Sequence, residues 1–422
     1  MATAVCLGLF LLGRRSLTTN EAAAVDAVSG GLGESLRSAL ERDPGGAVFT
    51  SILDRVAALS LDGGVVRAPA VAGFALAVVL AYLTGARLHG RRAGLAASLA
   101  LATAAPAVAA AQRVEATTLA LAFVLLSTWL LVRALDGEGG QSWPLYSTVT
   151  CGAMLVHPTV AAALLAHGLA LVVYQRSGAR VPRVAYAPLL FGAAVLTVAG
   201  IARLDAAGDP ERAGLRSGLA DAIGWNPLLA LLGIGGLIAS ATRRGPGGAP
   251  SKAALVAGLA LAPLLVAALA TPFVPVHAGT AGVVALGGVA LAAGAGVAAL
   301  RDRRLILGVA TATGTIALVG LGWWYTSSPG EDWRAMAAAL RTQPRADTIV
   351  VLPVRSRAAL ARELPGGLIV SRAAGDVVAV VLRGDDRRST AAARTVVQTP
   401  RYALLEERRI SDELVLQRWI RP

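Results

Sequence analysis

The residues best suited to chemistry in this sequence follow its first apolar run, in the segment Arg15 to Ala22. Glu21 offers a carboxylate there, beside the amide of Asn20, and Asp43 offers a second carboxylate farther along the same polar stretch. A carboxylate held at the mouth of a membrane protein can take the proton of an attacking hydroxyl group. The catalytic candidates are therefore Glu21 and Asp43, with Asn20 beside them, although an amide cannot take a proton.

Further polar residues stand at the ends of later apolar runs. They are the candidate substrate-binding residues Arg67, Gln112, Arg113, Glu115, His157 and His277. An arginine in such a place can bind a phosphate group. For each residue taken alone, a solvated loop position is the simpler interpretation, and His157, which precedes Pro158, equally suits a polar turn between two short spans.

The elements that must position these residues are membrane-spanning helices. The chain has 422 residues, of which 55% are hydrophobic and only 15% charged, whereas soluble domains carry about 25% charged residues. Apolar runs suited to crossing about 30 Å of hydrocarbon recur along the first three quarters of the chain. We expect eleven spans, near residues 2–13, 70–86, 93–111, 116–132, 145–157, 158–174, 184–202, 225–242, 253–272, 279–300 and 305–325.

The net charge of +13 follows the topology of a membrane protein. Alternate loops between the expected spans sum to +10, while the opposite loops sum to −2. Positive loops stay in the cytoplasm, so this pattern predicts a cytoplasmic N-terminus and places loop 14–68 and the tail outside the cytoplasm. With the basic residues explained in this way, nucleic-acid binding is not expected. The bias of basic residues toward arginine, with Lys252 alone as lysine, suggests a GC-rich bacterium and its plasma membrane.

Two domains are expected, a transmembrane domain over 1–326 and an extracytoplasmic α/β domain over 327–422. Within the first, loop 14–68 carries two amphipathic patterns, Leu32 to Leu40 and Val48 to Leu59, which predict helices along the membrane surface.

The tail predicts helices near 331–341, 356–364 and 389–398. It predicts strands near 348–353, 368–371, 377–382, 402–409 and 413–420. The fold class is thus a polytopic α-helical membrane protein with a small C-terminal α/β domain.

The expected spans are poor in charge at their centres. No Asp, Glu, Lys or Arg lies centrally, and we expect His167 to form a hydrogen bond between helices. Ion-coupled transporters place ionisable groups near the midplane, so a transporter is disfavoured. Cys6 and Cys151 lie in apolar runs without metal-ligand spacing, and we expect both to be buried.

Several short patterns, in order along the whole chain, resemble the GT-C superfamily of membrane glycosyltransferases, of the type related to protein O-mannosyltransferases and the lipid A aminoarabinose transferase. The first resembles the family pattern Ser-Leu-x-x-Asp-Glu-Ala. The patterns are Ser16–Ala22, Asp43–Pro44, Arg67–Pro69, Gly90–Gly94, Pro106 with Gln112, and Glu331–Arg334.

The resemblance implies that a hexosyl or pentosyl group passes from a polyprenyl-phosphate donor to an envelope glycan, lipid or protein acceptor outside the cytoplasm. The acidic loop residue would act as base, and basic residues near the outer edge would hold the lipid phosphate. No cofactor is certain, although some members of the superfamily use a divalent cation.

Departures from the family patterns leave a second hypothesis open. Asn20 stands where the family has its leading aspartate, and Glu115 and Ala278 replace basic or aromatic residues of later patterns. The alternative is a catalytically silent relative that acts as a scaffold or envelope-assembly protein. A transporter is a third, weaker hypothesis.

Overall fold

A computed structural model gives the fold of the chain. It describes residues 2–13, 15–28, 33, 47–137, 141–157, 159–205, 215–242, 249–270, 278–326, 331–342, 346–352, 354–364, 366, 369–370, 376–383, 395, 402–411 and 413–421. The chain divides into two compact units, each described here by itself. Unit 1 comprises Met1–Phe10, Gly33–Ile52 and Arg67–Trp323, and unit 2 comprises Leu11–Leu32, Leu53–Val66 and Trp324–Pro422.

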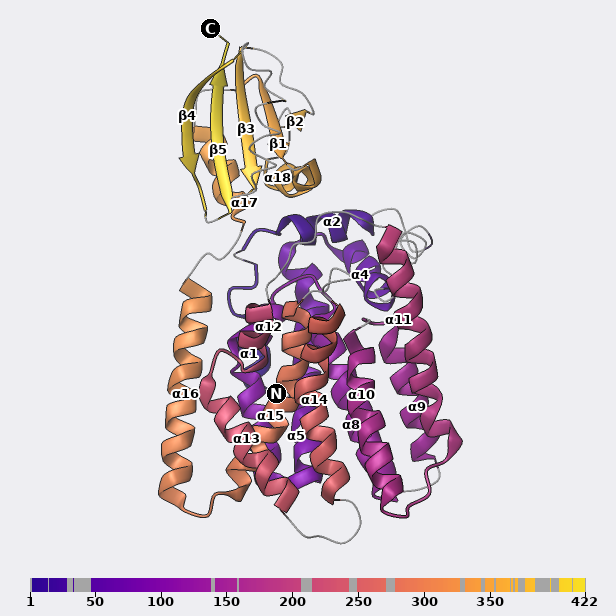
Figure 1. Ribbon diagram of the computed structural model, residues 1–422. Coiled ribbons are helices and arrows are strands. Elements are labelled where there is room, and N and C mark those ends of the chain that lie inside the picture. The colour runs from indigo at the N-terminus through magenta and orange to yellow at the C-terminus, as the bar shows by residue number, and fades with distance from the viewer. Residues whose placement is uncertain are drawn as a thin grey trace. The chain divides into compact units, whose positions relative to one another are not determined.

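Unit 1 is a bundle of helices that run side by side (Figure 1). Its helices are α1 (Ala2–Leu9), α5 (Gly63–His89), α6 (Arg91–Ala102), α7 (Ala105–Ala111), α8 (Thr117–Leu135), α9 (Ser142–Met154), α10 (Thr159–Arg176), α11 (Ala187–Asp205), α12 (Leu215–Ala222), α13 (Pro227–Thr242), α14 (Ala249–Ala270), α15 (Ala278–Ala299) and α16 (Arg303–Thr326), whose end enters unit 2. A short 3₁₀ turn, Arg183–Tyr186, precedes α11.

The chain is a multi-pass membrane protein, as predicted. Among the described residues, six helices are long and apolar enough to cross a membrane: α5, α8, α10, α14, α15 and α16. Helices α6 and α7 add a seventh span if the pair is counted together, although it bends by 61°. The number of eleven spans is therefore not confirmed, because helices such as α1, α9 and α13 are shorter than a full crossing. Pro106 explains the bend, since proline fits only the first turn of a helix.

Small residues let the helices of unit 1 approach closely. A Cβ atom on Gly236 of α13 would overlap the carbonyl oxygen of Ala292 in α15, whereas one on the adjacent Gly235 would meet nothing within 4 Å. A Cβ atom on Gly288 of α15 would likewise overlap the main-chain nitrogen of Ala260 in α14. Helices in lipid associate through such packing, so the glycine-rich runs are packing surfaces, as expected.

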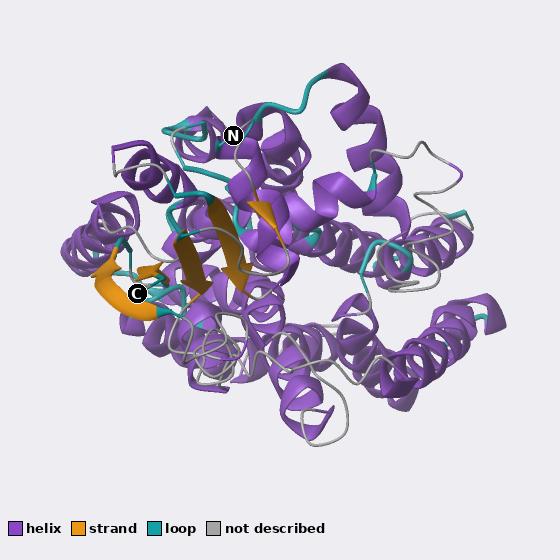
Figure 2. Cartoon of the chain, turned by 90° about the horizontal axis from the view of Figure 1, so that it is seen from above, coloured by secondary structure: helices purple, strands orange, loops and turns teal. Residues whose placement is uncertain are grey.

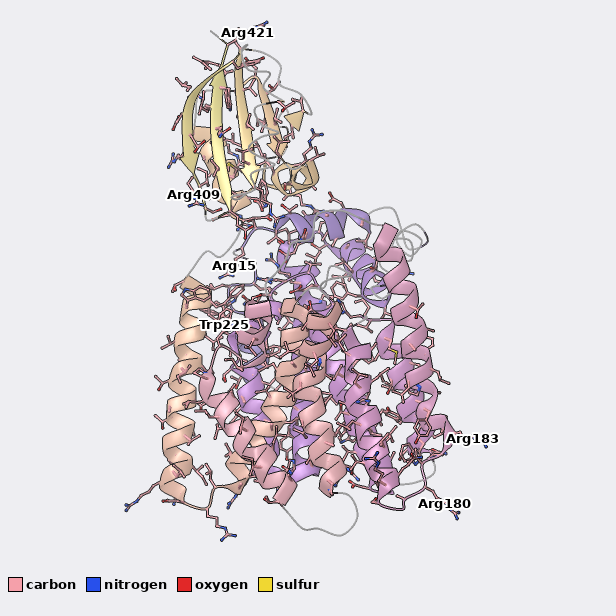
Figure 3. The ribbon with its side chains drawn as sticks, in the orientation of Figure 1. Arg15, Arg180, Arg183, Trp225, Arg409 and Arg421 are labelled. Atoms are coloured by element: carbon pink, nitrogen blue, oxygen red, sulfur yellow. The ribbon has the colours of Figure 1, made fainter. Side chains whose placement is uncertain are left out.

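The arginine-rich loops gather at one end of unit 1. Asp136, after α8, pairs with Arg87 of α5 at 3.0 Å and with Lys252 of α14 at 2.9 Å. Arg180 and Arg183 lie at the lower end of the bundle in Figure 3, away from Trp225. The basic residues of these loops thus lie at the ends of helices, as the charge pattern of the sequence predicts.

The few polar side chains inside the bundle bond to one another. His167 of α10 is fully buried, and its ring nitrogens contact the hydroxyl groups of Thr128 in α8 at 3.1 Å and Tyr146 in α9 at 3.2 Å. This confirms the expected interhelical hydrogen bond. The expectation for the cysteines is wrong, because Cys6 is exposed on the surface of α1 and Cys151 is only partly buried.

Unit 2 contains a five-stranded sheet in the order β2-β1-β3-β5-β4. Its strands are β1 (Thr348–Leu352), β2 (Ile369–Val370), β3 (Val377–Arg383), β4 (Ala403–Arg409) and β5 (Leu414–Ile420). Strand β1 is parallel to β2 and β3, while β5 is antiparallel to β3 and β4. Val350, Val380 and Trp419 lie in its apolar core. Figure 2 shows strands only in this sheet, with helix, turn and loop elsewhere in the described chain.

Helices from both ends of the sequence complete unit 2. They are α2 (Thr19–Ala27), α17 (Trp333–Thr342) and α18 (Arg357–Glu363), together with the later residues of α4 (Ala47–Leu59). The predicted order of strands and helices in the tail is confirmed where the chain is described. The helices expected near 32–40 and 389–398 lie almost wholly outside the described residues.

Candidate functional site

A carboxylate that the sequence analysis did not single out, Asp221, stands at the end of α12. Its Oδ1 accepts a hydrogen bond of 2.9 Å from the indole Nε1 of Trp225. In the turn that leads from Asp221 to the indole, Gly224 and Trp225 take positive φ angles of 65° and 56°. A tryptophan in this left-handed region is strained, and such strain persists only where the surroundings hold it. The turn therefore holds the indole against the carboxylate.

Helix α15 fixes the other side of Asp221. A Cβ atom on Gly279 would lie 3.3 Å from Oδ2 of Asp221, and one on Gly282 would lie 2.9 Å from the Asp221 Cβ. The absence of side chains at these two positions lets α12 approach the start of α15. On the far side, the ring of Trp225 meets that of Trp323 edge to face, with centroids 5.2 Å apart.

This environment makes Asp221 a weaker acid than an aspartate exposed to water. Burial raises its pKa to about 6, because the charged form loses contact with water. The hydrogen bond from Trp225 and the charge of Arg113 lower the pKa, and the charge of Glu115 raises it further. The structure thus brings the predicted residues Arg113 and Glu115 together with Asp221, and this carboxylate changes its charge close to neutral pH.

The loop that carries Arg113 and Glu115 is anchored by its neighbours. Arg113 and Glu115 approach each other at 3.9 Å in an exposed pair, which contributes little to stability. The hydroxyl groups of Thr117 and Thr280, at the starts of α8 and α15, are 3.3 Å apart. The two helix N-termini therefore meet beside the loop, where their dipoles favour negative charge.

Gln112 has a structural position. It is buried, and its amide Nε2 donates to the main-chain carbonyl groups of Leu7, Gly8 and Phe10 at 3.3, 3.3 and 2.8 Å. These carbonyl groups belong to the end of α1, where a helix leaves its last acceptors without partners in the helix. The side chain thus ties α1 to the end of α7.

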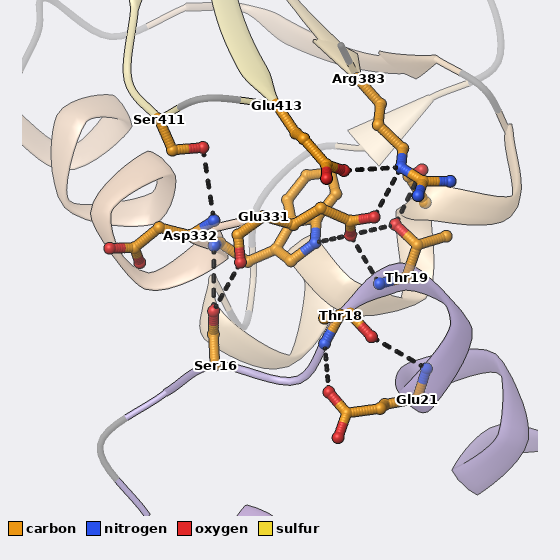
Figure 4. A network of polar contacts seen from close by, with 11 residues as sticks. Ser16, Thr18, Thr19, Glu21, Glu331, Asp332, Arg383, Ser411 and Glu413 are labelled. Carbon is orange, nitrogen blue, oxygen red and sulfur yellow. Dashed lines mark hydrogen bonds and ion pairs between the residues drawn. The ribbon is translucent and has the colours of Figure 1, made fainter. Parts of the chain in front are cut away.

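Glu21 lies in unit 2, where it takes part in the start of α2. Its Oε2 accepts from the main-chain N–H of Thr18 at 2.9 Å, and Thr18 Oγ1 accepts from the N–H of Glu21 at 3.3 Å (Figure 4). This reciprocal capping box stabilises the first turn of the helix. Glu21 is buried and the neighbouring Asn20 is exposed.

A second carboxylate, Glu331, binds the same end of α2. Its Oε2 accepts from the main-chain N–H of Thr19 and from the indole Nε1 of Trp333, each at 2.6 Å, and also from Thr19 Oγ1. Its Oε1 pairs with Arg383 Nε at 2.6 Å. Figure 4 shows these contacts converging on one carboxylate, which is almost fully buried.

Of the remaining predicted residues, two are described and two lie outside the described chain. Arg67 is buried within α5. His157 precedes α10, and its Nδ1 accepts from the N–H of Thr159 at 3.2 Å. Asp43 and His277 lie outside the described residues. Among the residues that the structure describes, no three His, Cys, Asp or Glu side chains form a group suited to a metal ion.

The fold matches solved membrane glycosyltransferases along nearly its whole length. ArnT from Cupriavidus metallidurans, in the apo state, aligns over 99% of this chain and 96% of its own, with a TM-score of 0.60 at 13% identity. The same protein bound to undecaprenyl phosphate gives 0.60 at 14% identity, with the same coverage. The Archaeoglobus fulgidus oligosaccharyltransferase aligns over 86% of this chain and 63% of its own, with a TM-score of 0.57 at 10% identity.

Sequence comparison agrees over part of the chain. The profile of the family described as Dolichyl-phosphate-mannose-protein mannosyltransferase matches residues 46–201. No curated protein matches the chain in sequence. The chain has the GT-C fold. The resemblance predicted from short patterns is confirmed at the level of the superfamily. The similarity of fold to ArnT covers 99% of the chain.

The roles of two carboxylates, Asp221 and Glu331, were not predicted from the sequence, for different reasons. Asp221 lies four residues before Trp225 and just ahead of an apolar run, a spacing that a helix would bring onto one face. That spacing was the available signal for Asp221. Glu331 was noticed as part of a pattern, but its contact with Thr19 joins positions more than 300 residues apart, which no local pattern reveals.

Proposed function

We propose that the chain is a membrane glycosyltransferase that transfers a sugar from a polyprenyl-phosphate donor to an acceptor outside the cytoplasm. The observation that carries this proposal is the GT-C fold, aligned over 99% of the chain with an ArnT bound to undecaprenyl phosphate. The charge of the loops further supports a bacterial plasma membrane with a cytoplasmic N-terminus.

The reaction requires two groups from the protein. The bond between the sugar C1 and the phosphate oxygen breaks, and the polyprenyl phosphate leaves with the electron pair. A bond forms between C1 and the acceptor oxygen, and the acceptor hydroxyl gives its proton to a base. Arg113, beside two helix N-termini, suits the phosphate that is released.

Two carboxylates are candidates for the base. The family resemblance favours Glu21, but that carboxylate already accepts from the N–H of Thr18 in the capping box. Asp221 is favoured by its pKa of about 6, since a base works best when its pKa lies near the working pH. We therefore assign the proton transfer to Asp221, with Arg113 lowering its pKa and binding phosphate.

The catalytically silent scaffold remains the second candidate, and a specific observation favours it. Asn20 cannot take a proton, and the only carboxylate beside it in the first loop pattern, Glu21, is engaged in local structure. A scaffold would keep the fold and lose turnover.

Purified protein in lipid vesicles separates the two. With undecaprenyl-phosphate hexose and pentose as donors, the enzyme releases undecaprenyl phosphate, and Asp221→Asn slows release about 100-fold or more, the usual scale for a missing general base. Glu21→Gln serves as the comparison variant and should retain more activity. Failure of the wild-type protein to turn over any donor, combined with an unchanged set of envelope sugars and lipids in a deletion strain, would favour the scaffold.

A further inference from the structure

The pattern Glu331–Arg334 takes no part in the chemistry proposed above, yet its first side chain binds the helix on which Asn20 and Glu21 lie. We propose that Glu331 is a positioning residue, through which the C-terminal domain sets the place of α2 during sugar transfer. This inference rests on the proposed function only for its effect on activity. The attachment of α2 can be tested without any substrate.

The contacts of Glu331 fix the first turn of α2 in direction as well as in place. Oε2 accepts from both the N–H and the hydroxyl group of Thr19, so one oxygen atom holds the main chain and the side chain of the same residue. Trp333 Nε1 donates to that oxygen at 2.6 Å, and Arg383 Nε holds the other at 2.6 Å. The carboxylate therefore cannot rotate without losing a partner.

The charge of Glu331 suits this position. The start of a helix presents unpaired N–H groups and the positive end of its dipole, and both favour an anion. Hydrogen bonds to a charged group are stronger than neutral ones, and burial strengthens them further. Arg383, at the end of β3, balances the negative charge and also lies 3.5 Å from Glu413.

Two further contacts hold α2 against the C-terminal domain. Before the helix, Ser16 Oγ accepts from the N–H of Trp333 at 3.1 Å. In its last turn, Asp26 pairs with Arg362 of α18 at 2.7 Å. The helix is thus held at both ends by residues of the tail, and Asn20 and Glu21 lie between the two attachments.

Glu331→Gln is an informative change because glutamine has nearly the same shape. If the amide oxygen occupies the Oε2 position, the amide NH₂ faces the guanidinium group of Arg383. If it occupies the Oε1 position, the NH₂ faces the three donors of Thr19 and Trp333. Either arrangement opposes donor to donor. Glu413→Gln is the matched control, since Glu413 also contacts Arg383 Nε, at 3.5 Å, whereas Glu331 is the carboxylate that accepts from Thr19 of α2.

Hydrogen exchange of the full-length protein in lipid nanodiscs tests the attachment. In Glu331→Gln, amides of residues 16–28 should exchange about tenfold faster or more, which corresponds to losing a hydrogen bond to a charged group. Amides of β3 should keep their wild-type rates, which shows that the domain is folded, and Glu413→Gln should leave residues 16–28 unchanged. Unchanged exchange in Glu331→Gln overturns the proposal.

A second pair of variants covers the case in which Glu331→Gln does not fold. Thr19→Val removes one donor to Oε2 and keeps the N–H, so it should speed exchange of residues 16–28 by a smaller factor. Thr19→Ser keeps the hydroxyl group and should restore the wild-type rate. Equal exchange in the valine and serine variants would contradict the proposal.

Activity then distinguishes positioning from simple attachment. With undecaprenyl-phosphate hexose as donor, folded Glu331→Gln should show a kcat reduced about tenfold while the KM for the donor stays within about twofold. Faster exchange with an unchanged kcat refutes the positioning role and leaves the glycosyltransferase proposal intact. A wild-type protein without any turnover refutes the proposed function instead, whereas the exchange result still reports on the attachment of α2.

Discussion

Replacing Trp225 by phenylalanine tests whether Asp221 is the group that takes the proton. The change removes the indole N–H that donates to Oδ1 at 2.9 Å and keeps an aromatic ring beside Trp323. A hydrogen bond to a charged group contributes about 1.5–3 kcal/mol, and one pKa unit corresponds to about 1.36 kcal/mol. Because Asp221 is only partly buried, the low end applies. Its pKa should rise by about one unit, from about 6 to roughly 7.

The consequence for activity depends on pH in a defined direction. A base must be ionised, so kcat/KM falls as the pH drops through the pKa of Asp221. At pH 7 the wild-type carboxylate is about 90% ionised and that of Trp225→Phe about half, so the variant should be about twofold slower. At pH 5 the difference should approach tenfold, and at pH 8.5 it should vanish. Raising the pH therefore rescues the variant.

The assay is release of undecaprenyl phosphate by protein in vesicles, measured as kcat/KM from pH 5 to 8.5. Trp323→Phe is the control, because Trp323 touches the ring of Trp225 but is not the donor to Asp221. Its profile should match the wild type. Asp221 is not the base if Trp225→Phe and Trp323→Phe give the same profile, or if Asp221→Asn retains an inflection near pH 6.

Two structural predictions concern unit 1 and are checked by thermal denaturation in detergent. Gln112→Glu replaces a donor by an acceptor that faces three carbonyl groups, which should cost about 1–3 kcal/mol of stability, whereas Gln141→Glu at an exposed position should cost almost nothing. Equal denaturation midpoints would contradict the role given to Gln112. Gly236→Ala should cost about 1–3 kcal/mol of stability, because the new methyl group forces α13 away from α15. Gly235→Ala is the control and should leave the stability unchanged. If both variants lose stability, the cause is helix flexibility and not the packing of α13 on α15.

The membrane character and the tail domain could be predicted from sequence because each depends on local patterns. A run of apolar residues such as 279–300 is long enough to be a span wherever its neighbours lie, and β-branched runs such as 348–353 form strands by the fit of their side chains to a pleated surface. The number of full spans was less predictable. Bends and short helices depend on packing, as at Pro106.

The candidate site was only partly predictable. Arg113 and Glu115 were recognised from their place between spans, and both act on Asp221. The side chain of Gln112 could have faced a ligand or the main chain on sequence grounds, and only its contacts with α1 decide between them. Asp43 and His277 stay predictions, because they lie outside the described residues.

The class of the protein follows from the sequence, since hydropathy, loop charge and strand patterns act over short stretches of chain. The sequence also identified Asn20 and Glu21 as a pair worth testing. The surroundings of each carboxylate, in contrast, depend on how distant parts of the chain pack together. Glu21 caps its own helix, Glu331 binds that helix from a distance of more than 300 residues, and Asp221 is buried beside Trp225. The chemistry of a carboxylate depends on its burial and its partners, and contacts across the chain create both.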